Sequence, residues 1–471
     1  MVVKTIGTLI ASAVLGAVDP PELVAPVTTT EPVETQVDPD WVHDVEPIII
    51  RRCGQCHRNG GAGPFSLGSH REVAGRGRFL LELVDAGRMP PWLPTGTGWR
   101  DDRRLTLAEK QLLRRWVDTG AIRDRDEEAS GRSVLTPADT DTDTDTDTDT
   151  ISPGHEGWLE RGLVESFKIP AESDPAWHQG VIDQRGTTIP LDNLKPLRLQ
   201  GMGIDTGAPQ AVRLASFAFD DTGAGRYLDD RDPRVGFLMS ADAGLTPSGA
   251  HGIVLGGANE LRWPEGFHVP VPAAADAVIE WHYRPTGIDE TARPRIRLEL
   301  VDDGEESRPL HWLPVGIGRI QIPAEAVQVI QSEPVLLAVD AMLVGLTPRA
   351  LQITRTIELL EIPPGESPET ARPVLRIGDW DHHQRETLVL QSPRIVPAGT
   401  RFMARFQVDN RTENPSNPDS PAVEVRRGRR TGVLAVLLHL AAVSPENDEA
   451  LASAGPELIR ALRGRGAVRG D

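Results

Sequence analysis

The stretch Cys53-Gly54-Gln55-Cys56-His57 decides how the first part of this chain folds. A Cys-x-x-Cys-His run is the sequence signature for covalent attachment of a c-type haem. The two thiols add to vinyl groups of the porphyrin, and the histidine that follows becomes the proximal ligand of the iron. One short turn must span the haem edge and still present an imidazole to the metal. The motif therefore predicts that Cys53 and Cys56 anchor a haem c and that His57 ligates its iron.

Three other roles are open to such a cysteine pair: a disulfide, a redox dithiol or half of a zinc site. The chain has only 2 cysteines, so no disulfide framework surrounds them. A zinc site needs further soft ligands close by. A thioredoxin-like dithiol occurs in a βαβ setting, which the flanking sequence lacks. These considerations favour haem attachment.

Length and composition indicate a multidomain protein with a β-rich majority. The 471 residues are enough for about three domains of ordinary size. The 40 prolines and 45 glycines favour turns between short strands. A formal net charge of −19 argues against nucleic acid as a partner. The segment 41–125 is an exception, because its 15 Lys and Arg against 10 Asp and Glu give it a net charge of +5.

The N-terminal segment 1–17 has the layout of a signal peptide. Lys4 precedes an apolar run from Ile6 to Leu15, and small residues follow; a buried N-terminal helix is the alternative. The run is too short to cross a bilayer, and no later stretch reaches ~18 uninterrupted apolar residues, so no transmembrane segment is expected. The segment 18–40, rich in Pro, Val, Thr and Glu, is predicted to be a flexible spacer. We therefore expect an exported, periplasmic or extracellular protein.

Residues 41–125 show helical periodicity. Apolar residues at 42, 45, 48 and 49 form one face that leads directly into the haem motif. A second amphipathic helix is predicted over 71–86, with Gly87 at its C-terminal cap. A third is predicted from Thr106 to Gly120, with Thr106 as its N-terminal cap. Three helices around one haem predict a small all-α cytochrome c domain, in which the cofactor fills much of the core.

Met89 is the candidate sixth ligand of the iron. It lies in Met89-Pro90-Pro91-Trp92 and is the only methionine of the segment 41–125. A thioether is the usual partner of the proximal histidine in cytochromes c, and it raises the reduction potential. The two prolines stiffen the loop that presents it. His70 is the alternative ligand, and a role in core packing is the alternative for Met89.

The segment 126–157 is predicted to be an acidic linker. Asp139 to Thr150 consists of six consecutive Asp-Thr dipeptides, which are too polar to form a packed core. Repulsion between the aspartates should keep the linker extended. It acts either as a plain tether or as an acidic arm that rests against the basic segment 41–125 at low salt.

From Trp158 the sequence reads as short β-strands separated by Gly, Pro, Asn and Asp turns. The clearest strand is Ala277–Arg284, in which odd-numbered and even-numbered residues face opposite sides. The other strands are expected at Ala211–Phe219, Arg295–Leu300, Val335–Val344, Gln352–Leu360, Arg401–Val408 and Val433–Leu440. The pattern predicts all-β tandem sandwiches over 158–310 and 311–444, and a tail over 445–471 with one amphipathic helix.

Two series of motifs carry a resemblance to known families. The first comprises Cys53–His57, Gly63-Pro64-Phe65-Ser66-Leu67, Arg88-Met89-Pro90-Pro91-Trp92 and Trp116-Val117-Asp118-Thr119-Gly120-Ala121. It resembles a recurring bacterial c-type cytochrome module. The second comprises Trp263-Pro264-Glu265-Gly266, Trp281-His282-Tyr283-Arg284-Pro285-Thr286-Gly287, Asp379-Trp380-Asp381, Pro397-Ala398-Gly399-Thr400-Arg401 and Asp409-Asn410 with Asn414-Pro415-Ser416-Asn417-Pro418. It resembles the copper type II, ascorbate-dependent, peptidylglycine monooxygenase-like region to which that module is commonly fused, and it implies jelly-roll-like sandwiches.

The resemblance implies two copper sites, but the ligand pattern is degenerate here. The family's His-His pair falls on Arg213-Leu214, its His-x-His on Arg349-Ala350-Leu351 and its methionine near Val433. Only His282 matches a ligand. Copper needs several imidazole or thioether donors, whereas arginine stays protonated. We therefore expect that no copper is bound.

The remaining histidines do not supply a replacement site. His382 and His383 are adjacent in an extended segment, where neighbouring side chains point to opposite faces, and they are expected at the surface. The others are scattered over the β region: His251, His268, His311 and His439.

The leading hypothesis is an electron-transfer protein: an exported cytochrome c that exchanges single electrons with a redox partner protein. Its β region is then a docking or binding body, a pseudoenzyme rather than an active monooxygenase. Arg213 and Arg349 would favour an anionic small ligand in the sandwich cleft. The alternatives are a haem-coupled copper hydroxylase and a non-redox ligand-binding surface protein.

Overall fold

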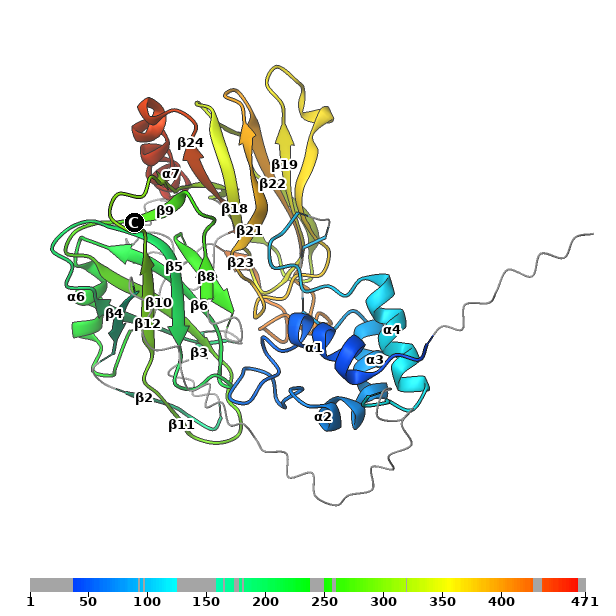
Figure 1. Cartoon of the computed structure of the whole chain (residues 1–471). Helices are drawn as coiled ribbons and strands as arrows, with labels where there is room; N and C mark the ends of the chain where they lie inside the picture. Colours follow the sequence, from blue (N-terminus) through cyan, green and yellow to red (C-terminus); the bar gives the residue numbers. More distant parts are fainter. Residues whose placement is uncertain are drawn as a thin grey trace, which may run out of the picture. The chain divides into compact units, whose positions relative to one another are not determined.

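The structure, a computed structural model, is mostly β-sheet with few helices (Figure 1). It describes residues 37–91, 94–95, 98–124, 158–163, 166–172, 178–179, 182–237, 250–255, 260–318, 320–426 and 434–464. No helix within these ranges is long and apolar enough to cross a membrane. The predicted signal peptide 1–17, nearly all of the spacer 18–40 and the acidic linker 126–157 lie outside the described residues.

Short helical elements occupy the segment from Trp41 to Asp118. They are η1 (Trp41–Val45), α1 (Glu46–Arg52), α2 (His70–Ala74), α3 (Gly77–Asp85) and α4 (Leu107–Asp118). Their apolar side chains meet in one core that contains the fully buried Trp116. Val45 and Ile49 pack into this core, as their spacing predicts, whereas Val42 is exposed.

The single helix predicted over 71–86 is wrong, because the structure has two helices there. α2 begins after Ser69, which forms a reciprocal capping box with Glu72. It ends at Gly75, a residue with low helix propensity, and the chain turns before α3 begins. Gly77 then lies against α4, where an added Cβ would come within 2.8 Å of a methyl carbon of Val117. The break therefore allows α3 to approach α4 closely.

The third predicted helix is confirmed at both ends. The Glu109 N–H donates to the Thr106 hydroxyl at 3.1 Å, and the Thr106 N–H donates to the Glu109 carboxylate at 2.6 Å. Gly120 follows the helix with a φ of 98°, in the left-handed region that suits glycine after a helix end. Local hydrogen bonding thus determines where α4 starts and stops.

The β region begins with two sheets that share one core. Its elements are β1 (Trp158–Gly162), β2 (Phe167–Ile169), β3 (His178–Gln179), β4 (Ile182–Pro190), β5 (Leu197–Asp205), β6 (Val212–Asp220), α6 (Ala224–Arg231), β7 (Gly252–Leu255), β8 (Glu260–Arg262), β9 (Phe267–Val271), β10 (Asp276–Tyr283), β11 (Glu290–Ala292), β12 (Arg295–Leu300) and β13 (Arg308–Pro309). One sheet has the order β1-β12-β5-β9-β13, with β8 paired to β5, and the other has the order β3-β4-β10-β6-β7. Trp263 and Trp281 are buried in the core that both sheets supply.

A second pair of sheets follows in the chain. Its elements are β14 (His311–Ile317), β15 (Gln321–Ile322), β16 (Val327–Gln331), β17 (Val335–Leu336), β18 (Ala341–Arg349), β19 (Thr354–Ile362), η2 (Pro368–Thr370), β20 (Arg372–Ile377), β21 (Leu388–Val396), β22 (Arg401–Asp409), β23 (Val425–Arg426), β24 (Leu434–Ala442), η3 (Pro445–Asn447) and α7 (Asp448–Gly464). The orders are β14-β24-β18-β21 and β16-β22-β19-β20, with β17 paired to β22. These strands enclose a second apolar core. The helix predicted in the tail is α7, and Leu451 anchors it in that core.

Most predicted strands lie within a few residues of an observed one, and Val335–Val344 is divided between β17 and β18. Strand β10 is buried along its whole length, because it lies between β4 and β6 with both faces covered. Ile279 and Trp281 face the first core. The opposite face carries Glu280 and His282, and the latter is only 1% exposed. Alternation separated the two faces correctly but did not indicate that the polar face is also buried.

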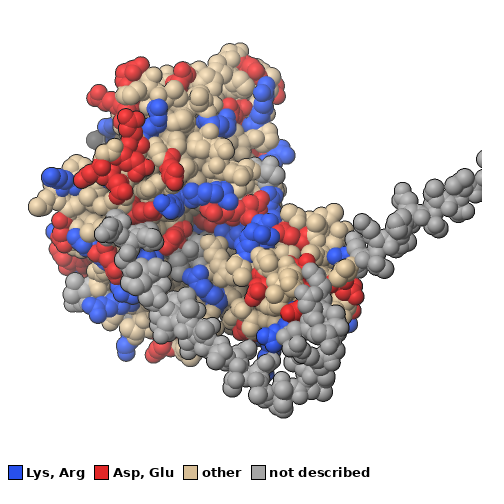
Figure 2. Space-filling view, viewed as in Figure 1, with Lys and Arg blue, Asp and Glu red and all other residues tan. Residues whose placement is uncertain are grey.

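Many charged side chains of the helical segment are paired with opposite charges. Glu109 accepts hydrogen bonds from both Arg51 and Arg52, and Arg114 contacts Asp85 at 2.6 Å. On the face drawn in Figure 2, acidic and basic side chains are interspersed. These pairs join residues that the net charge of +5 already counts, so they leave that net charge unchanged, but they leave fewer free cations for an acidic arm to contact.

The loop between Met89 and Arg103 connects the helices to the second β core. Trp99, which is 5% exposed, packs among the side chains of that core. The backbone contacts include isolated bridges of Pro94 with Ile377 and of Trp99 with Leu390, and a hydrogen bond from the Thr95 N–H to the Arg376 carbonyl oxygen at 2.7 Å. The loop that carries Met89 is therefore held by the β region.

Replacing Trp99 with alanine should lower the free energy of unfolding by about 3–5 kcal/mol, because it leaves a cavity in the second β core. Urea and thermal unfolding of the full chain measure the change. The control is Leu194→Ala, which alters a 96% exposed side chain and should change stability by less than about 0.5 kcal/mol. Equal stability of the two variants would show that Trp99 is not docked as described.

Candidate functional site

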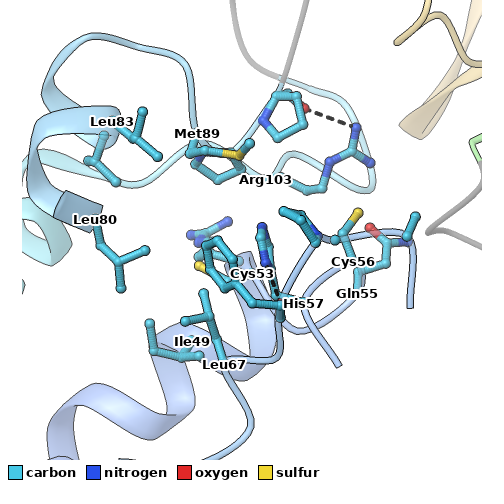
Figure 3. A pocket seen from close by; sticks show the side chains of 18 of the residues that line it. Ile49, Cys53, Gln55, Cys56, His57, Leu67, Leu80, Leu83, Met89 and Arg103 are labelled. Carbon is cyan, nitrogen blue, oxygen red and sulfur yellow. Dashed lines mark hydrogen bonds between the residues drawn. The ribbon is translucent and has the colours of Figure 1, made fainter. Parts of the chain in front are cut away.

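A cavity of about 530 Å³ lies beside the turn that follows α1 (Figure 3). Its lining is largely apolar and includes Ile49, Leu67, Leu80, Leu83, Val84 and Leu113. Cys53, Cys56, His57 and Met89 all line the same cavity. The structure thus brings together the four residues that the sequence indicates for a haem site, in the kind of concave apolar pocket that holds cofactors.

The two cysteines lie on one turn that its own backbone holds in place. The N–H groups of Cys56 and His57 both donate to the Cys53 carbonyl oxygen, at 3.2 and 3.0 Å. Both cysteines are free thiols. Burial, and to a smaller degree Cys56, raises the pKa of the Cys53 thiol to about 11, and burial also raises the pKa of Cys56. The thiols stay protonated at neutral pH, whereas a redox dithiol needs a lowered pKa.

The His57 imidazole is oriented by the segment 63–67. Its Nδ1 lies 2.9 Å from the Phe65 carbonyl oxygen and donates a hydrogen to it, which leaves Nε2 free to ligate a metal. The Phe65 ring packs against the imidazole with 4.9 Å between ring centroids. Gly63 is required for this approach, because a Cβ there would come within 2.7 Å of His57 Nδ1. The glycine and the carbonyl group together hold the imidazole in one orientation.

Met89 lies just beyond the C-terminal end of α3. The N–H groups of Arg88 and Met89 both donate to the Leu83 carbonyl oxygen, at 2.9 and 3.2 Å. Gly87, with a φ of 68°, adopts the left-handed conformation that ends the helix. Figure 3 shows the Met89 thioether across the cavity from His57. A thioether facing an imidazole across an apolar cavity fits the two axial positions of a haem iron.

His70, the alternative sixth ligand, does not line the cavity. Its Nε2 lies 2.7 Å from the Ala121 carbonyl oxygen. Its ring packs edge-on against Trp41 and Trp116, with centroid distances of 6.0 and 5.9 Å. The side chain is at the start of α2, which directs it toward the aromatic core. Of the two candidates, Met89 is the one in position to act as a ligand.

The β region supplies part of the cavity wall, which the sequence did not indicate. Arg213, Tyr283, Arg284, Asp381 and His383 line the cavity from this side. The wall is secured by a salt bridge between two further residues, Arg103 and Glu386, whose Nη1 and Oε2 atoms are 3.1 Å apart. The candidate site is therefore shared between the helical segment and the strands.

The fold brings two of the expected copper positions together, because Leu214 and His282 are register partners on β6 and β10. Arg213 lines the cavity, whereas Arg349 lies 3.9 Å from Glu280, in the buried cluster that also contains His282. Leu214 and Leu351 belong to different apolar clusters, and position 433 lies outside the described residues. The described residues that could share one metal ion are Asp40, His43 and Asp124, none of them at a copper position. Loss of copper remains a prediction, supported by the arginine and leucine side chains at these positions, which do not ligate copper.

A guanidinium group lies between the two histidines nearest the expected copper position. Arg385 Nη2 donates to His282 Nε2 at 2.7 Å, and Arg385 Nη1 donates to His382 Nε2 at 2.8 Å. His382 Nδ1 in turn lies 3.1 Å from the Ala350 carbonyl oxygen. A cation tethered to the chain thus lies where a metal ion would need to bind both imidazoles. Nothing in the spacing of Arg385 singled it out in the sequence.

The prediction that His382 and His383 lie at the surface is wrong. Both are only partly exposed, and the His382 ring lies 5.8 Å from that of His282. The segment that carries them follows Trp380, whose side chain is buried in the second core. Anchoring by this tryptophan brings the histidines against β10, a contact between distant segments that adjacent spacing cannot reveal.

Burial keeps the imidazoles of this cluster neutral. Burial and the nearby Arg385 lower the pKa of His282 to about 4, and they lower the pKa of His382 as well. Burial and Arg349 lower the pKa of Arg385 to about 9. Burial raises the pKa of Glu280. His282 and the guanidinium groups of Arg349 and Arg385 lower it more strongly, so the pKa lies well below its ordinary value. At pH 7 the cluster contains ionised arginines, an ionised carboxylate and neutral imidazoles that can accept hydrogen bonds.

Comparison with known proteins does not assign a family. No family model and no curated protein matches the chain. Among solved structures, PNGF-II aligns with 60% of this chain at 10% identity and a TM-score of 0.25, and this chain spans 65% of its length. The major capsid protein P2 of bacteriophage PM2 aligns over 60% of this chain and 99% of its own, at 9% identity and a TM-score of 0.21. The STIV MCP aligns over 53% and 95%, at 10% identity and a TM-score of 0.19. These likenesses are too weak to support a fold family or a function.

Acid should destabilise the β region through its buried histidines. Burial lowers the pKa of His439 to about 3, and His282 has a pKa of about 4, whereas an unfolded histidine titrates near 6.5. The unfolded chain therefore binds more protons below pH ~6.5, and each histidine lowers the free energy of unfolding by up to ~1.4 kcal/mol per pH unit as the pH falls toward 4.

Urea unfolding at several pH values measures this slope. His439→Gln should reduce the slope by about the contribution of one histidine to the pH dependence of the free energy of unfolding. The change also removes the hydrogen bond between His439 and Thr347. Leu194→Gln, at a side chain that is 96% exposed, alters no titratable group, and as the control it should leave the slope unchanged. A slope in the His439→Gln variant equal to that of the unaltered chain would contradict the assignment.

Proposed function

We propose that this protein is an exported c-type cytochrome that carries single electrons. Cys53 and Cys56 hold the haem through thioether bonds, and His57 and Met89 ligate its iron. The observation that supports this most strongly is that one apolar cavity gathers all four side chains, with the imidazole and the thioether facing each other across it. The protonated thiols and the position of Met89 favour haem over a redox dithiol or a zinc site.

The chain's own groups prepare the cavity for its cofactor. When bound, the haem supplies the one-electron redox chemistry of its iron. The Phe65 carbonyl group holds His57 in the tautomer that presents Nε2. The Met89 thioether raises the reduction potential relative to a second imidazole. Apolar side chains such as Leu80 and Leu83 exclude water and so favour the less charged, reduced iron.

In this proposal, residues 41–125 are a small all-α cytochrome c domain, and 158–444 are tandem jelly-roll-like sandwiches of copper monooxygenase descent. Replacement of the copper ligands supports a docking or binding role for the sandwiches rather than hydroxylation. The guanidinium of Arg385 between His282 and His382 supports it further, because a cation in that place excludes a metal ion.

The electron is exchanged with a partner redox protein outside the cytoplasm, in the periplasm or beyond the cell. The predicted signal peptide over 1–17 supports this location, since covalent haem attachment in bacteria takes place after export. The side chains of the β region that line the cavity support a function in which electron carrier and docking body meet at the cofactor.

Covalent attachment can be tested by denaturing gel electrophoresis and haem staining. The unaltered chain from cells competent in cytochrome c maturation should give a stained band, and C53S/C56S should give none because no thioether bond can form. Met89→Ala is the matched control and should keep the stain, since axial ligation is not covalent. A colourless band from the unaltered chain would refute the proposed function.

Ligation by Met89 can be tested by its effect on the reduction potential. Met89→Ala should keep the haem but open the sixth position, admit added imidazole and lower the potential by at least about 59 mV, a tenfold change in a one-electron equilibrium. Spectroelectrochemical titration measures the shift. His70→Ala should leave both spectrum and potential unchanged. The reverse result, with His70 decisive and Met89 silent, would overturn the ligand assignment.

A further inference from the structure

We infer that Arg213 and Arg284 bind the propionate carboxylates of the haem, so that the β region completes the cofactor site. The inference rests on the proposed haem function and extends it to residues outside the cytochrome segment. Both arginines line the cavity that Cys56 and His57 also line, although they lie far from the haem motif in the sequence.

A β-bulge places Arg213 at the cavity. The pairs on either side of the bulge are Leu214 with His282 and Val212 with Tyr283. Arg213 is the extra residue between these pairs, and a bulge redirects such a side chain out of the regular alternation. Arg284 follows the last residue of β10, and its N–H donates to the Ala211 carbonyl oxygen at 2.8 Å. The two arginines are therefore held at the same level of adjacent strands.

The cavity arginines fall into two classes. The described residues that line the cavity include Arg52, Arg103, Arg213 and Arg284. Arg52 forms a salt bridge with Glu109 at 3.1 Å and donates to the Asp102 carbonyl oxygen at 2.6 Å. Arg103 forms a salt bridge with Glu386. The first two arginines therefore already have acidic partners within the chain.

Arg213 and Arg284 have no such partner. Neither guanidinium makes a hydrogen bond or a salt bridge within the part of the chain that the structure describes. Burial and the like charge of Arg284 lower the pKa of Arg213, and Asp381 opposes them only in part. Because arginine stays protonated, this section of the wall carries excess positive charge. A partly buried charge without a counterion is costly, so an anion that enters the cavity is stabilised there.

The chemistry of the site identifies the anion. A guanidinium offers donors in a planar fork that matches a carboxylate. The rest of the cavity wall is largely apolar and suits a porphyrin ring. A haem anchored at Cys53 and Cys56 would bring its propionates into the same cavity. Among the described residues that line it, Arg213 and Arg284 are the arginines without an acidic hydrogen-bond partner. The haem would therefore carry, in its propionates, the negative charges that Arg213 and Arg284 lack.

The test uses the full haem-loaded chain with R213Q, R284Q and the double variant. Loss of a guanidinium beside the haem removes a charge that favours the added electron, so each single variant should shift the one-electron equilibrium about tenfold toward the oxidised form, or 59 mV. Arg213→Lys should retain most of the potential. Arg231→Gln, which removes an exposed guanidinium outside the cavity, should change nothing.

A second readout distinguishes carboxylate binding from a general effect of charge. Redox-induced infrared difference spectra should show carboxylate bands that shift in R213Q and R284Q, and that remain in Asp381→Asn, which removes the neighbouring protein carboxylate. Thermal unfolding of each variant checks that the fold is retained.

The outcomes separate the inference from the proposed function. Haem that stays attached with unchanged potential and unchanged carboxylate bands in the double variant would overturn the inference and leave the cytochrome intact. A shift that arises only when phosphate or succinate is added would also overturn it, because the arginines would then serve a free anion. An unaltered chain that carries no haem would refute the proposed function itself.

Discussion

The hydrogen bond from His57 Nδ1 to the Phe65 carbonyl oxygen is the interaction on which the candidate site depends. A single hydrogen bond of this kind contributes only about 1 kcal/mol to stability, but it determines which nitrogen faces the cavity. It forms because Gly63 carries no side chain that would collide with the imidazole. The roles proposed for Met89 and for the arginines of the β region both assume that this imidazole faces the cavity.

The loop between Met89 and Arg103 ties that site to the strands. At one end the thioether enters the cavity, and further along Trp99 is buried in the second β core. At its far end Arg103 pairs with Glu386. The same loop therefore joins a side chain that lines the cavity to one that is buried in the second β core.

The buried cluster around Arg385 holds distant segments of the β region together through the chain's own polar groups. Imidazole nitrogens would hold a metal ion, but here the Arg385 guanidinium donates hydrogen bonds to both His282 and His382. Burial disfavours charged imidazoles, so the neutral rings are free to accept from arginine. Glu280 supplies an opposite charge within the cluster, which reduces the cost of the buried cations. Hydrogen bonds and an opposite charge within the chain thus hold these side chains together.

The sequence alone determined the features that depend on neighbouring residues. Local hydrogen bonds, capping and alternation need no distant partner, and they account for the turn from Cys53 to His57, the capped helix from Thr106 and the positions of most strands. Tertiary structure decided the rest: which of Met89 and His70 reaches the cavity, where His382 lies, and that Arg213 lines the cavity at all. These depend on contacts between segments far apart in the chain, on a β-bulge and on a helix break at a glycine. Such contacts arise only when separate elements pack, because a spacing pattern records the face of an element and not what that face will meet.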